Sequence, residues 1–221
     1  MIGKGKSISH GVAALEYDLA KEINGQAVAT EIARHELYGC TGAEMVQEMK
    51  PYHIDFPNVK NNCLRFEVSP SIEESATFTD ADWAELGNDF MQRMGLANHQ
   101  YIIIRHSGTE SKKEQAHLHI LANRVSLSGE LYRDNWIGKK ATEAANAIAK
   151  ERNFVQSQDI GKVNKAEIKE AMDGVLKKMQ GFDFTKFKEE LGKRGFKVRE
   201  ARASTGKLNG YYVTARSGTE Y

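Results

Sequence analysis

The chain has 221 residues, 40% of them hydrophobic and 28% charged, with 31 basic residues against 30 acidic ones. At about 150 residues per domain, this length predicts one or two domains with a sizeable apolar core. The composition excludes a disordered tail. No window approaches the roughly 18 apolar residues of a membrane span, and the N-terminal segment lacks the apolar stretch of a secretory signal. We therefore expect a cytoplasmic protein without membrane insertion.

The cysteines and the charges narrow the chemistry further. Cys40 and Cys63 lie far apart without a Cys-x-x-Cys partner, which argues against a disulfide framework and a thiolate zinc site. Residues 67–89 contain seven acidic and no basic residues, whereas residues 186–207 contain eight basic and three acidic ones. A basic patch of this kind can follow nucleic-acid phosphates, although an ordinary solvated surface has the same composition.

Apolar periodicity predicts interleaved helices and strands. A first helix is expected to be capped by Ser7 or Ser9, with Val12, Leu15 and Leu19 on one face. The remaining helices are expected at 41–49, 79–94, 136–152, 164–179 and 183–193, and the strands at 64–69, 101–105, 116–125, 196–200 and 211–215. Thr41 with Glu44 three residues on is the expected cap of the helix at 41–49, and the helix at 79–94 carries an apolar stripe of Trp83, Leu86, Phe90 and Met94. Without regular β-α-β spacing, this order predicts an α+β fold on a largely antiparallel sheet with flanking helices.

A histidine pair on one strand is the strongest chemical signal. His117 and His119 lie two residues apart, so their side chains share a face and can converge on one cation. His106 ends the preceding strand and joins the pair if the two strands form a hairpin. Three imidazoles leave positions for water or substrate, which suits catalysis, although such a pair is also common in hydrogen-bonded cores. His10, His35, His53 and His99 are lower-ranked candidates for the third ligand.

Several known catalytic signatures are absent from the sequence. There is no G-x-S-x-G elbow, P-loop, G-x-G-x-x-G fingerprint or H-E-x-x-H helix. The basic region at 186–207 instead favours a phosphodiester substrate, because a cation held by neutral imidazoles can stabilise the charge that develops on a phosphate.

The segment His-Leu-His-Ile-Leu-Ala-Asn at 117–123, preceded by Tyr-Ile-Ile-Ile-Arg-His at 101–106, resembles the third motif of plasmid mobilisation relaxases, which are His-hydrophobic-His (HUH) endonucleases. Phe-Glu-Val-Ser-Pro at 66–70, the predicted helix at 79–95 and the late hairpin at 206–215 resemble further segments of that family in the same order. The resemblance covers most of the chain. It implies a relaxase domain with an about five-stranded antiparallel sheet.

The resemblance also implies roles for individual residues. Tyr17 matches the nucleophilic tyrosine, which attacks one strand of single-stranded DNA at a transfer origin and forms a 5′-phosphotyrosyl adduct that can be rejoined. His106, His117 and His119 match the ligands of a divalent ion, with Mg²⁺ or Mn²⁺ expected and other transition metals open. The spacing from His106 to His117 is longer than the family's, and Gly108 stands where an Asp is usual.

Other residues receive expected roles from their positions. Glu67 shares a strand face with Ser69 and is expected to orient a ligand histidine or accept a proton. Aromatic residues such as Tyr211, Tyr212 or Trp136 are candidates to stack on bases, although at least half of them are expected to fill the core instead. The expected DNA-binding residues are Ser69, Asn123, Arg124, Lys197, Arg199, Arg202 and Lys207.

The predicted organisation is a single relaxase domain over 1–221, with a helical segment at 135–195, taken from a longer bacterial protein. Accessory DNA-binding proteins and the coupling protein of a secretion channel are possible partners. Three alternatives stay open: a rolling-circle replication initiator, a non-catalytic single-stranded DNA-binding module and a hydrolase of small phosphoesters. The initiator expects a Tyr-x-x-Lys helix after the histidine pair, and no downstream tyrosine begins that motif.

Overall fold

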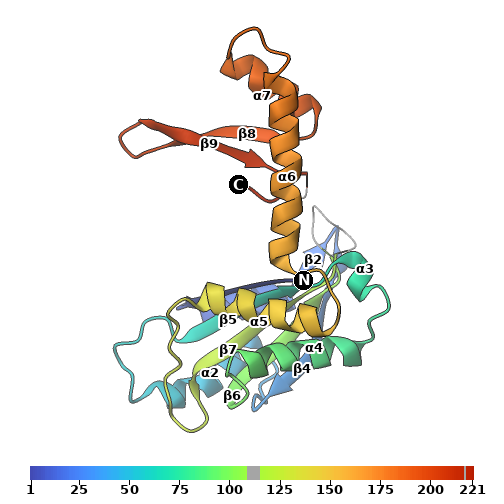
Figure 1. Ribbon diagram of the computed structural model, residues 1–221. Helices are drawn as coiled ribbons and strands as arrows, with labels where there is room; N and C mark the ends of the chain where they lie inside the picture. The colour runs from blue at the N-terminus through green and yellow to red at the C-terminus, as the bar shows by residue number, and fades with distance from the viewer. Residues whose placement is uncertain (109–114, 217) are drawn as a thin grey trace. The chain divides into compact units, whose positions relative to one another are not determined.

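The computed structural model describes residues 1–108, 115–216 and 218–221. Its contacts divide the chain into two units, Met1–Ser157 and Gln158–Tyr221 (Figure 1). The single relaxase domain expected over 1–221 stays a prediction, because two such units can serve one activity. The helices expected within 135–195 are shared between the units.

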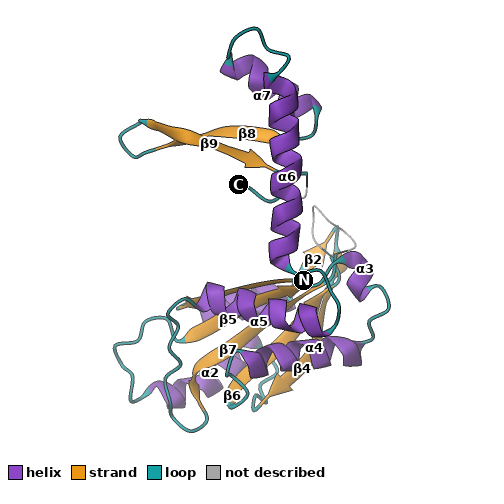
Figure 2. Ribbon diagram, in the orientation of Figure 1, coloured by secondary structure: helices purple, strands orange, loops and turns teal. Residues whose placement is uncertain are grey.

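Antiparallel strands form the framework of the first unit, in the order β1-β5-β7-β6-β4 (Figure 2). This five-stranded sheet confirms the predicted α+β architecture. Its strands are β1 (Ile2–Ile8), β4 (Ala29–His35), β5 (Cys63–Ser69), β6 (His99–His106) and β7 (His117–Ser126), and a separate ribbon pairs β2 (Glu22–Ile23) with β3 (Gln26–Ala27).

Two pairs of helices flank the sheet. One pair is α4 (Asp80–Arg93) and α5 (Ile137–Glu151), which lie side by side over the strands in Figure 1. The other pair is α1 (Gly11–Leu19) and α2 (Gly42–Met49), which contact each other on the opposite face. The short elements are α3 (Ile72–Ser75) and a 3-10 helix, η1 (Lys50–His53).

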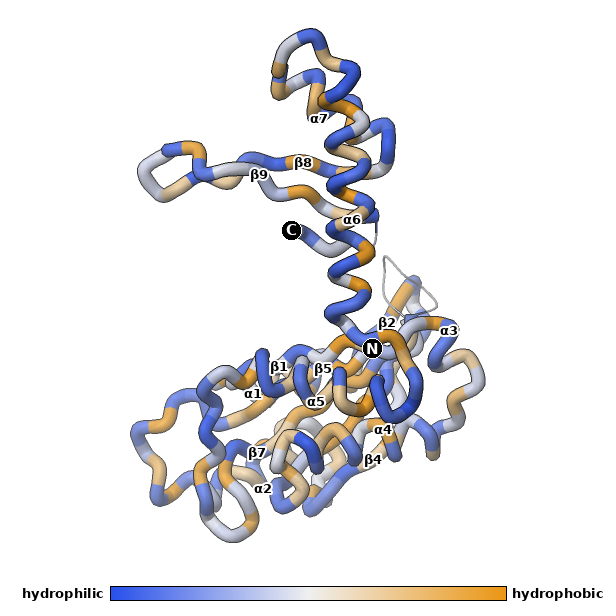
Figure 3. Tube along the Cα trace, viewed as in Figure 1, coloured by the Kyte–Doolittle hydropathy of each residue, from blue (hydrophilic) through white to orange (hydrophobic). Residues whose placement is uncertain are grey.

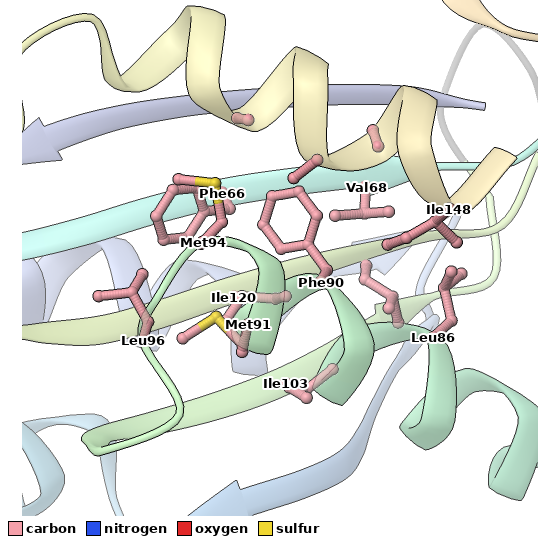
Figure 4. Packing of buried hydrophobic residues seen from close by; sticks show 14 of the residues in the cluster. Phe66, Val68, Leu86, Phe90, Met91, Met94, Leu96, Ile103, Ile120 and Ile148 are labelled. Carbon is pink, nitrogen blue, oxygen red and sulfur yellow. The ribbon is translucent and has the colours of Figure 1, made fainter. Parts of the chain in front are cut away.

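The main core lies between the sheet and the α4–α5 pair (Figure 4). Alternate residues of β5, including Phe66 and Val68, point into it, as the period of two in a strand requires. Leu86 and Phe90 of α4 meet them, and the rings of Phe66 and Phe90 pack edge to face with centroids 5.5 Å apart. The stripe predicted for the helix at 79–94 is therefore confirmed as a core face.

The second face of the sheet is only partly covered. Its apolar end, with Cys63, Ile102 and Leu121, packs with α1 and α2 in a smaller cluster. Its other end carries the alternating polar residues of the same strands, including Glu67 and His119. The helices that flank this face therefore leave a polar end open, and the functional side chains gather there.

The two edge strands of the sheet, β1 and β4, were not predicted. The sequence of β1 alternates glycine with lysine rather than apolar with polar residues. Gly3 and Gly5 face α5 so closely that a Cβ built on Gly3 would lie 2.4 Å from the main-chain oxygen of Ala141. Side chains there would force α5 away from the sheet. The buried face of β1 is thus formed by glycines without side chains, so the strand has no alternation of apolar and polar residues by which it could be predicted.

The predicted caps had mixed outcomes. Ser7 lies in β1, and the N-cap of α1 is His10 with no side-chain hydrogen bond, so the expected serine cap is wrong. In α2 the capping box of Thr41 with Glu44 is confirmed, with each side chain bonded to the other's main-chain N–H. The helix α1 is instead held by contacts of its buried face, including Leu15.

The second unit has its own apolar core. It contains α6 (Ser157–Leu176), α7 (Phe184–Lys193) and the hairpin of β8 (Lys197–Arg202) with β9 (Leu208–Thr214). Phe187 and Leu191 of α7 pack with Val198 and Val213 of the hairpin. The late hairpin and both helices were predicted, with α6 beginning earlier than expected.

Within the described residues, none of the helices is long and apolar enough to cross a membrane. Figure 3 shows the reason in α6, where hydrophilic and hydrophobic positions alternate along the helix. Cys40 is an exposed free thiol and Cys63 a buried one, and burial raises the pKa of the Cys63 thiol to about 11. Neither belongs to a disulfide, as the sequence predicted.

We predict opposite effects for alanine at two glycines of the β1–α5 contact. Gly3→Ala should lower the free energy of unfolding by about 1–3 kcal/mol, because the new methyl overlaps the backbone of α5. Gly138→Ala, where the nearest atom is 3.5 Å away, should raise it by up to about 1 kcal/mol by favouring the helix. Urea denaturation of both variants measures this, and equal effects would contradict the close packing of β1 on α5.

Candidate active site

The three histidines predicted as a cluster meet at the open end of the sheet. β6 and β7 are hydrogen-bonded neighbours with His106 opposite His117, and His119 lies two residues further along the same face. One ligand atom from each residue lies within 4.8 Å of the others. The Nε2 atoms of His117 and His119 are 3.0 Å apart. The hairpin register thus brings together residues from two strands, as the sequence predicted.

Hydrogen bonds orient two of the rings. Nε2 of His106 lies 2.7 Å from the main-chain oxygen of Asp18, to which it donates when protonated. Nδ1 of His117 lies 3.2 Å from the main-chain oxygen of Gln115. Because a neutral imidazole carries a proton on only one nitrogen, these bonds leave lone pairs on Nδ1 of His106 and Nε2 of His117. Both lone pairs are then available to a cation.

A buried carboxylate lies beneath the triad. Asp18, in the last turn of α1, is only 2% exposed and accepts a two-point ion pair from Arg65 of β5, with Nε donating at 3.1 Å. Its Oδ1 atom also lies 3.8 Å from Nδ1 of His119. Asp18 therefore joins α1 to β5 through its side chain and to β6 through its main-chain bond with His106.

The surroundings favour the neutral imidazole in His106 and His119. Burial, together with the neighbouring histidines, Arg65 and Lys4, lowers the pKa of His119 to about 2. Burial also lowers the pKa of His106 below its ordinary value. Burial raises the pKa of Asp18 despite its bonds to Arg65. Neutral imidazole is the form that binds a metal ion, so the site favours the ligating state of both histidines.

The donor set fits a divalent cation. Nδ1 of His119 is buried and has no hydrogen-bond partner within the described residues. A metal-ligating histidine usually presents its second nitrogen to a carboxylate, and Asp18 is the carboxylate on that side. Two imidazole nitrogens 3.0 Å apart can both reach one ion at about 2.1 Å. The structure thus agrees with a metal bound by His106, His117 and His119.

Tyr17 precedes Asp18 in α1 and lies 56% exposed. Its hydroxyl accepts a hydrogen bond of 2.8 Å from Nζ of Lys21, whose ammonium also lowers the pKa of His106. The end of α1 is therefore fixed at the triad through Asp18, while the phenol of the adjoining residue faces solvent. A phenol in this position is accessible to a large substrate.

Glu67 lies on the same open face, in register with His119 on the neighbouring strand. Its carboxylate pairs with Nζ of Lys4 on β1 at 3.1 Å. Among the described residues, no hydrogen bond joins Glu67 to a histidine of the triad. The carboxylate that faces a histidine of the triad is that of Asp18, and the orienting role predicted for Glu67 stays a prediction.

Three residues predicted to contact DNA are buried or hydrogen-bonded within the first unit. Asn123 is fully buried, and its amide bonds to the main chain of Met49 and the side chain of Gln100. Arg124 uses its guanidinium on main-chain oxygens and on Asp134. Ser69 is buried and accepts a hydrogen bond from Gln115. Alternation placed these side chains on strands but did not show which neighbours cover them.

The other predicted DNA-binding residues lie on the hairpin of the second unit. Arg199 forms a two-point ion pair with Glu220 and lies over the ring of Tyr212. Arg202 pairs with Glu200. Lys197 and Lys207 are exposed. The hairpin thus presents two lysines directly, while its two arginines carry neighbouring carboxylates.

The remaining histidines lie away from the triad. Rings of His35, His53 and His99 hydrogen-bond to main-chain or side-chain oxygens elsewhere, with His53 and His99 both contacting Asn123. Their lower ranking as ligands agrees with these contacts.

Sequence reasoning missed Asp18, Arg65 and Lys21. In the sequence each of them looks like an ordinary charged residue of a helix, strand or turn. Only Asp18 could have been noticed, because it is an acidic residue on the helix face that also carries Leu15.

Comparisons with known proteins place these observations in context. A family model described as a relaxase, MobA/VirD2-like nuclease domain, matches residues 17–154, more than half of the chain, including Tyr17 and all three histidines. The chain is similar to the structure of the conjugative relaxase TrwC in complex with OriT DNA in its metal-bound form, with 11% identity over 95% of this chain and 75% of that one, and a TM-score of 0.38. The metal-free complex gives 10% identity, coverages of 95% and 74%, and a TM-score of 0.41. No curated protein matches significantly.

We predict that Arg65→Met destabilises the protein by about 3–5 kcal/mol, because it leaves the Asp18 carboxylate buried without its partner. The loss should grow between pH 5 and pH 8. Without Arg65 the native pKa of Asp18 rises further above its unfolded value, so the native state holds the proton more strongly and loses stability as pH rises through that range.

The double variant Asp18→Leu with Arg65→Met is the control, since it removes both charges. It should recover most of the lost stability in urea denaturation at either pH. A double variant as unstable as Arg65→Met would show that the ion pair is not the cause.

Proposed function

The chain belongs to the MobA/VirD2-like relaxase nuclease family, and from that membership we propose that it nicks one strand of DNA at a transfer origin by tyrosine transesterification and later rejoins it. The observation that carries this proposal is the histidine triad at the open end of the sheet, tied through Asp18 to the helix that bears an exposed Tyr17. A nucleophile and a site for the scissile phosphate are thereby held on adjoining elements.

The proposed reaction begins with the hydroxyl of Tyr17. Its oxygen attacks phosphorus, the bond from phosphorus to the 3′ oxygen breaks, and the 3′ oxygen leaves as a hydroxyl after gaining a proton. The 5′ phosphate stays on Tyr17 as a diester, so the reverse attack by a 3′-hydroxyl restores the strand without ATP. The ammonium of Lys21, already bonded to the phenol oxygen, stabilises negative charge on that oxygen when the proton leaves.

Glu67 is the proposed proton acceptor. Its carboxylate lies on the open face, in register with His119 and 3.1 Å from Nζ of Lys4, where it can accept a proton from a substrate-bound nucleophile. Asp18 has a different role in this proposal. Because it is buried and engaged by Arg65, it positions His119 and His106 rather than exchanging protons with substrate.

His106, His117 and His119 are the proposed ligands of a divalent ion. When bound, such an ion supplies positive charge that polarises the scissile phosphate and stabilises its transition state. Mg²⁺ and Mn²⁺ are the proposed ions, from phosphate chemistry and availability, whereas imidazole ligands also suit other transition metals. The three residues contribute neutral nitrogens, so the whole charge of the ion is directed at the phosphate.

Single-stranded DNA is the proposed partner, since a phosphate held within a duplex cannot enter a site at the surface of a sheet beside a helix end. The second unit contributes charge: it has 14 basic and 9 acidic residues, a net of +5, against 17 and 21 in the first unit, a net of −4. Lys197 and Lys207 are its proposed hairpin contacts, with Arg199 and Arg202 released from their carboxylates by DNA. The proposal places this activity in the bacterial cytoplasm, with accessory DNA-binding proteins and a coupling protein as partners.

We predict that Tyr17→Phe abolishes a covalent protein–DNA adduct. The wild type, incubated with Mn²⁺ and single-stranded DNA containing its own transfer origin, should form an adduct that survives a denaturing gel. Phe lacks the attacking oxygen, so the adduct should fall by at least about 10³-fold. Tyr38→Phe is the matched control, because Tyr38 is also an exposed tyrosine of the first unit.

The outcomes separate the alternatives. An adduct that persists in Tyr17→Phe moves the nucleophile to another tyrosine and favours a replication initiator. Cleavage without an adduct favours a hydrolase. DNA binding without cleavage of the origin, in the presence of Mn²⁺, favours a non-catalytic binding module.

We also predict that the triad binds one Mn²⁺ per chain. His117→Ala and His119→Ala should each weaken binding by at least about tenfold in isothermal titration calorimetry, because each removes a ligand. His10→Ala, at the exposed start of α1, is the control. Circular dichroism verifies that the variants fold, and undiminished Mn²⁺ binding by both folded triad variants would contradict the assignment.

A further inference from the structure

A second group of cations lies on the open face beside the triad. A cavity of about 230 Å³ is lined by Lys4 and Lys6 of β1, Arg65 and Glu67 of β5, and His119. None of these lysines was singled out by the sequence, because β1 itself was not recognised there. The cavity joins the triad to the edge of the sheet.

Strand register explains this arrangement. Lys4 pairs with Glu67, which pairs with His119, so the three residues follow one another across β1, β5 and β7. Lys6 likewise lies opposite Arg65. Neighbouring strands are about 4.8 Å apart, so the lysines of β1 begin about 10 Å from the triad. A phosphate bound at the triad would therefore have the lysines about 10 Å away, where the neighbouring phosphates of the same DNA strand can lie.

The basic residues on this face differ in whether a carboxylate is already paired with them. Arg65 is engaged by Asp18, and Lys4 is paired with Glu67. Lys6 is exposed and, among residues 1–108, 115–216 and 218–221, has no hydrogen-bond or ion-pair partner. Since the first unit carries a net charge of −4, its overall field does not attract DNA. A local cluster of lysines therefore has to provide the attraction near the triad.

An exposed tryptophan stands near the same edge strand. Trp136 is 80% exposed and precedes α5 with a left-handed backbone, φ 59° and ψ 28°. Bulky residues rarely adopt this conformation, and it persists where surrounding structure enforces it. Gly138, two residues on, lies against the main-chain oxygen of Gly5. The start of α5 thus holds an indole beside the strand that carries Lys4 and Lys6.

We propose that Lys4 and Lys6 bind the phosphates that flank the scissile one, and that Trp136 stacks on a base of the same strand as it leaves the sheet over β1. This inference rests on the proposed function for the position of the scissile phosphate. Lysines supply sequence-independent phosphate binding, and an exposed aromatic ring supplies a sequence-tolerant stacking platform. Together they define a track for single-stranded DNA within the first unit, separate from the basic hairpin.

The lysine part is tested by the salt dependence of DNA binding. Fluorescence anisotropy with a labelled, mixed-sequence single-stranded DNA is measured over a range of KCl concentrations in the Tyr17→Phe background, which prevents adduct formation. Each lysine that contacts a phosphate should contribute about 0.7 to the slope of log affinity against log salt. Lys6→Ala should therefore lower the slope by about 0.7, and the double variant with Lys4→Ala by about 1.4.

Lys150→Ala is the matched control, an exposed lysine in the last turn of α5. It should leave the slope unchanged. An unchanged slope in the folded double variant, or the same decrease in Lys150→Ala, would overturn the lysine assignment.

Glu67→Gln gives a result in the opposite direction. Removing the carboxylate frees Lys4 and removes a negative charge from the track, so DNA should bind more tightly. Tighter binding together with reduced adduct formation would support both the track and the proton-accepting role of Glu67. Weaker binding would contradict the track.

The stacking part has its own readout. The chain has two tryptophans, and Trp83 is buried in the core at 2% exposure. Single-stranded DNA should quench the fluorescence of Trp136, and Trp136→Phe should remove that quenching while Trp83 still emits. Trp136→Ala should weaken binding by about 5- to 150-fold, and Trp136→Phe by less. Quenching that survives in Trp136→Phe would overturn the stacking.

These measurements also separate failure of the track from failure of the proposed function. If origin DNA yields no adduct but the lysine variants still lower the salt slope, the nicking proposal fails and the track stands. If wild type forms the adduct while both lysine variants bind as wild type does, nicking stands and the track fails.

Discussion

The Asp18 carboxylate, buried at the end of α1, holds the parts of this site together. Its ion pair with Arg65 fixes α1 to β5, and its main-chain oxygen fixes the ring of His106. The same carboxylate faces the unpaired nitrogen of His119. A buried charge tolerates little movement, because separation from its partner would leave it without solvent or compensation. The helix that carries Tyr17 is therefore held in a fixed relation to the histidines.

The sheet provides the other requirement, an open polar face. Its first face is closed by α4 and α5, with glycines in β1 that allow α5 to approach closely. Its second face is covered by α1 and α2 only at the apolar end. Polar residues of adjacent strands thus share the open end of this face: Lys4, Glu67 and His119 lie in a row, with the buried His106 and His117 beside them. Because alternate residues of a strand point to opposite faces, the same strands form both the core and the proposed reaction surface.

Charge is distributed unevenly between the units, which suits the proposed reversible reaction on DNA. The family's nuclease region lies in the unit with net charge −4, and the unit with net charge +5 carries the basic hairpin. In the first unit several cations are already paired with carboxylates, including Lys4 with Glu67 and Arg65 with Asp18. Such pairs limit non-specific attraction, because DNA must compete with an existing partner. Contacts close to the triad can then select productive binding.

Local patterns in the sequence were sufficient for much of the fold and for the histidine triad. The alternation in β5, the capping box of α2 and the stripe of α4 depend on neighbours within a few residues, so sequence alone predicted them. The His-x-His pair follows the same rule. Other features depend on residues distant in the chain. Only the tertiary structure revealed β1, because its glycines make sense only where α5 packs against them. The same holds for the burial of Asn123 and for the contacts of Asp18 with Arg65 and His119. Burial and pairing across strands are set by packing, which a single segment does not encode.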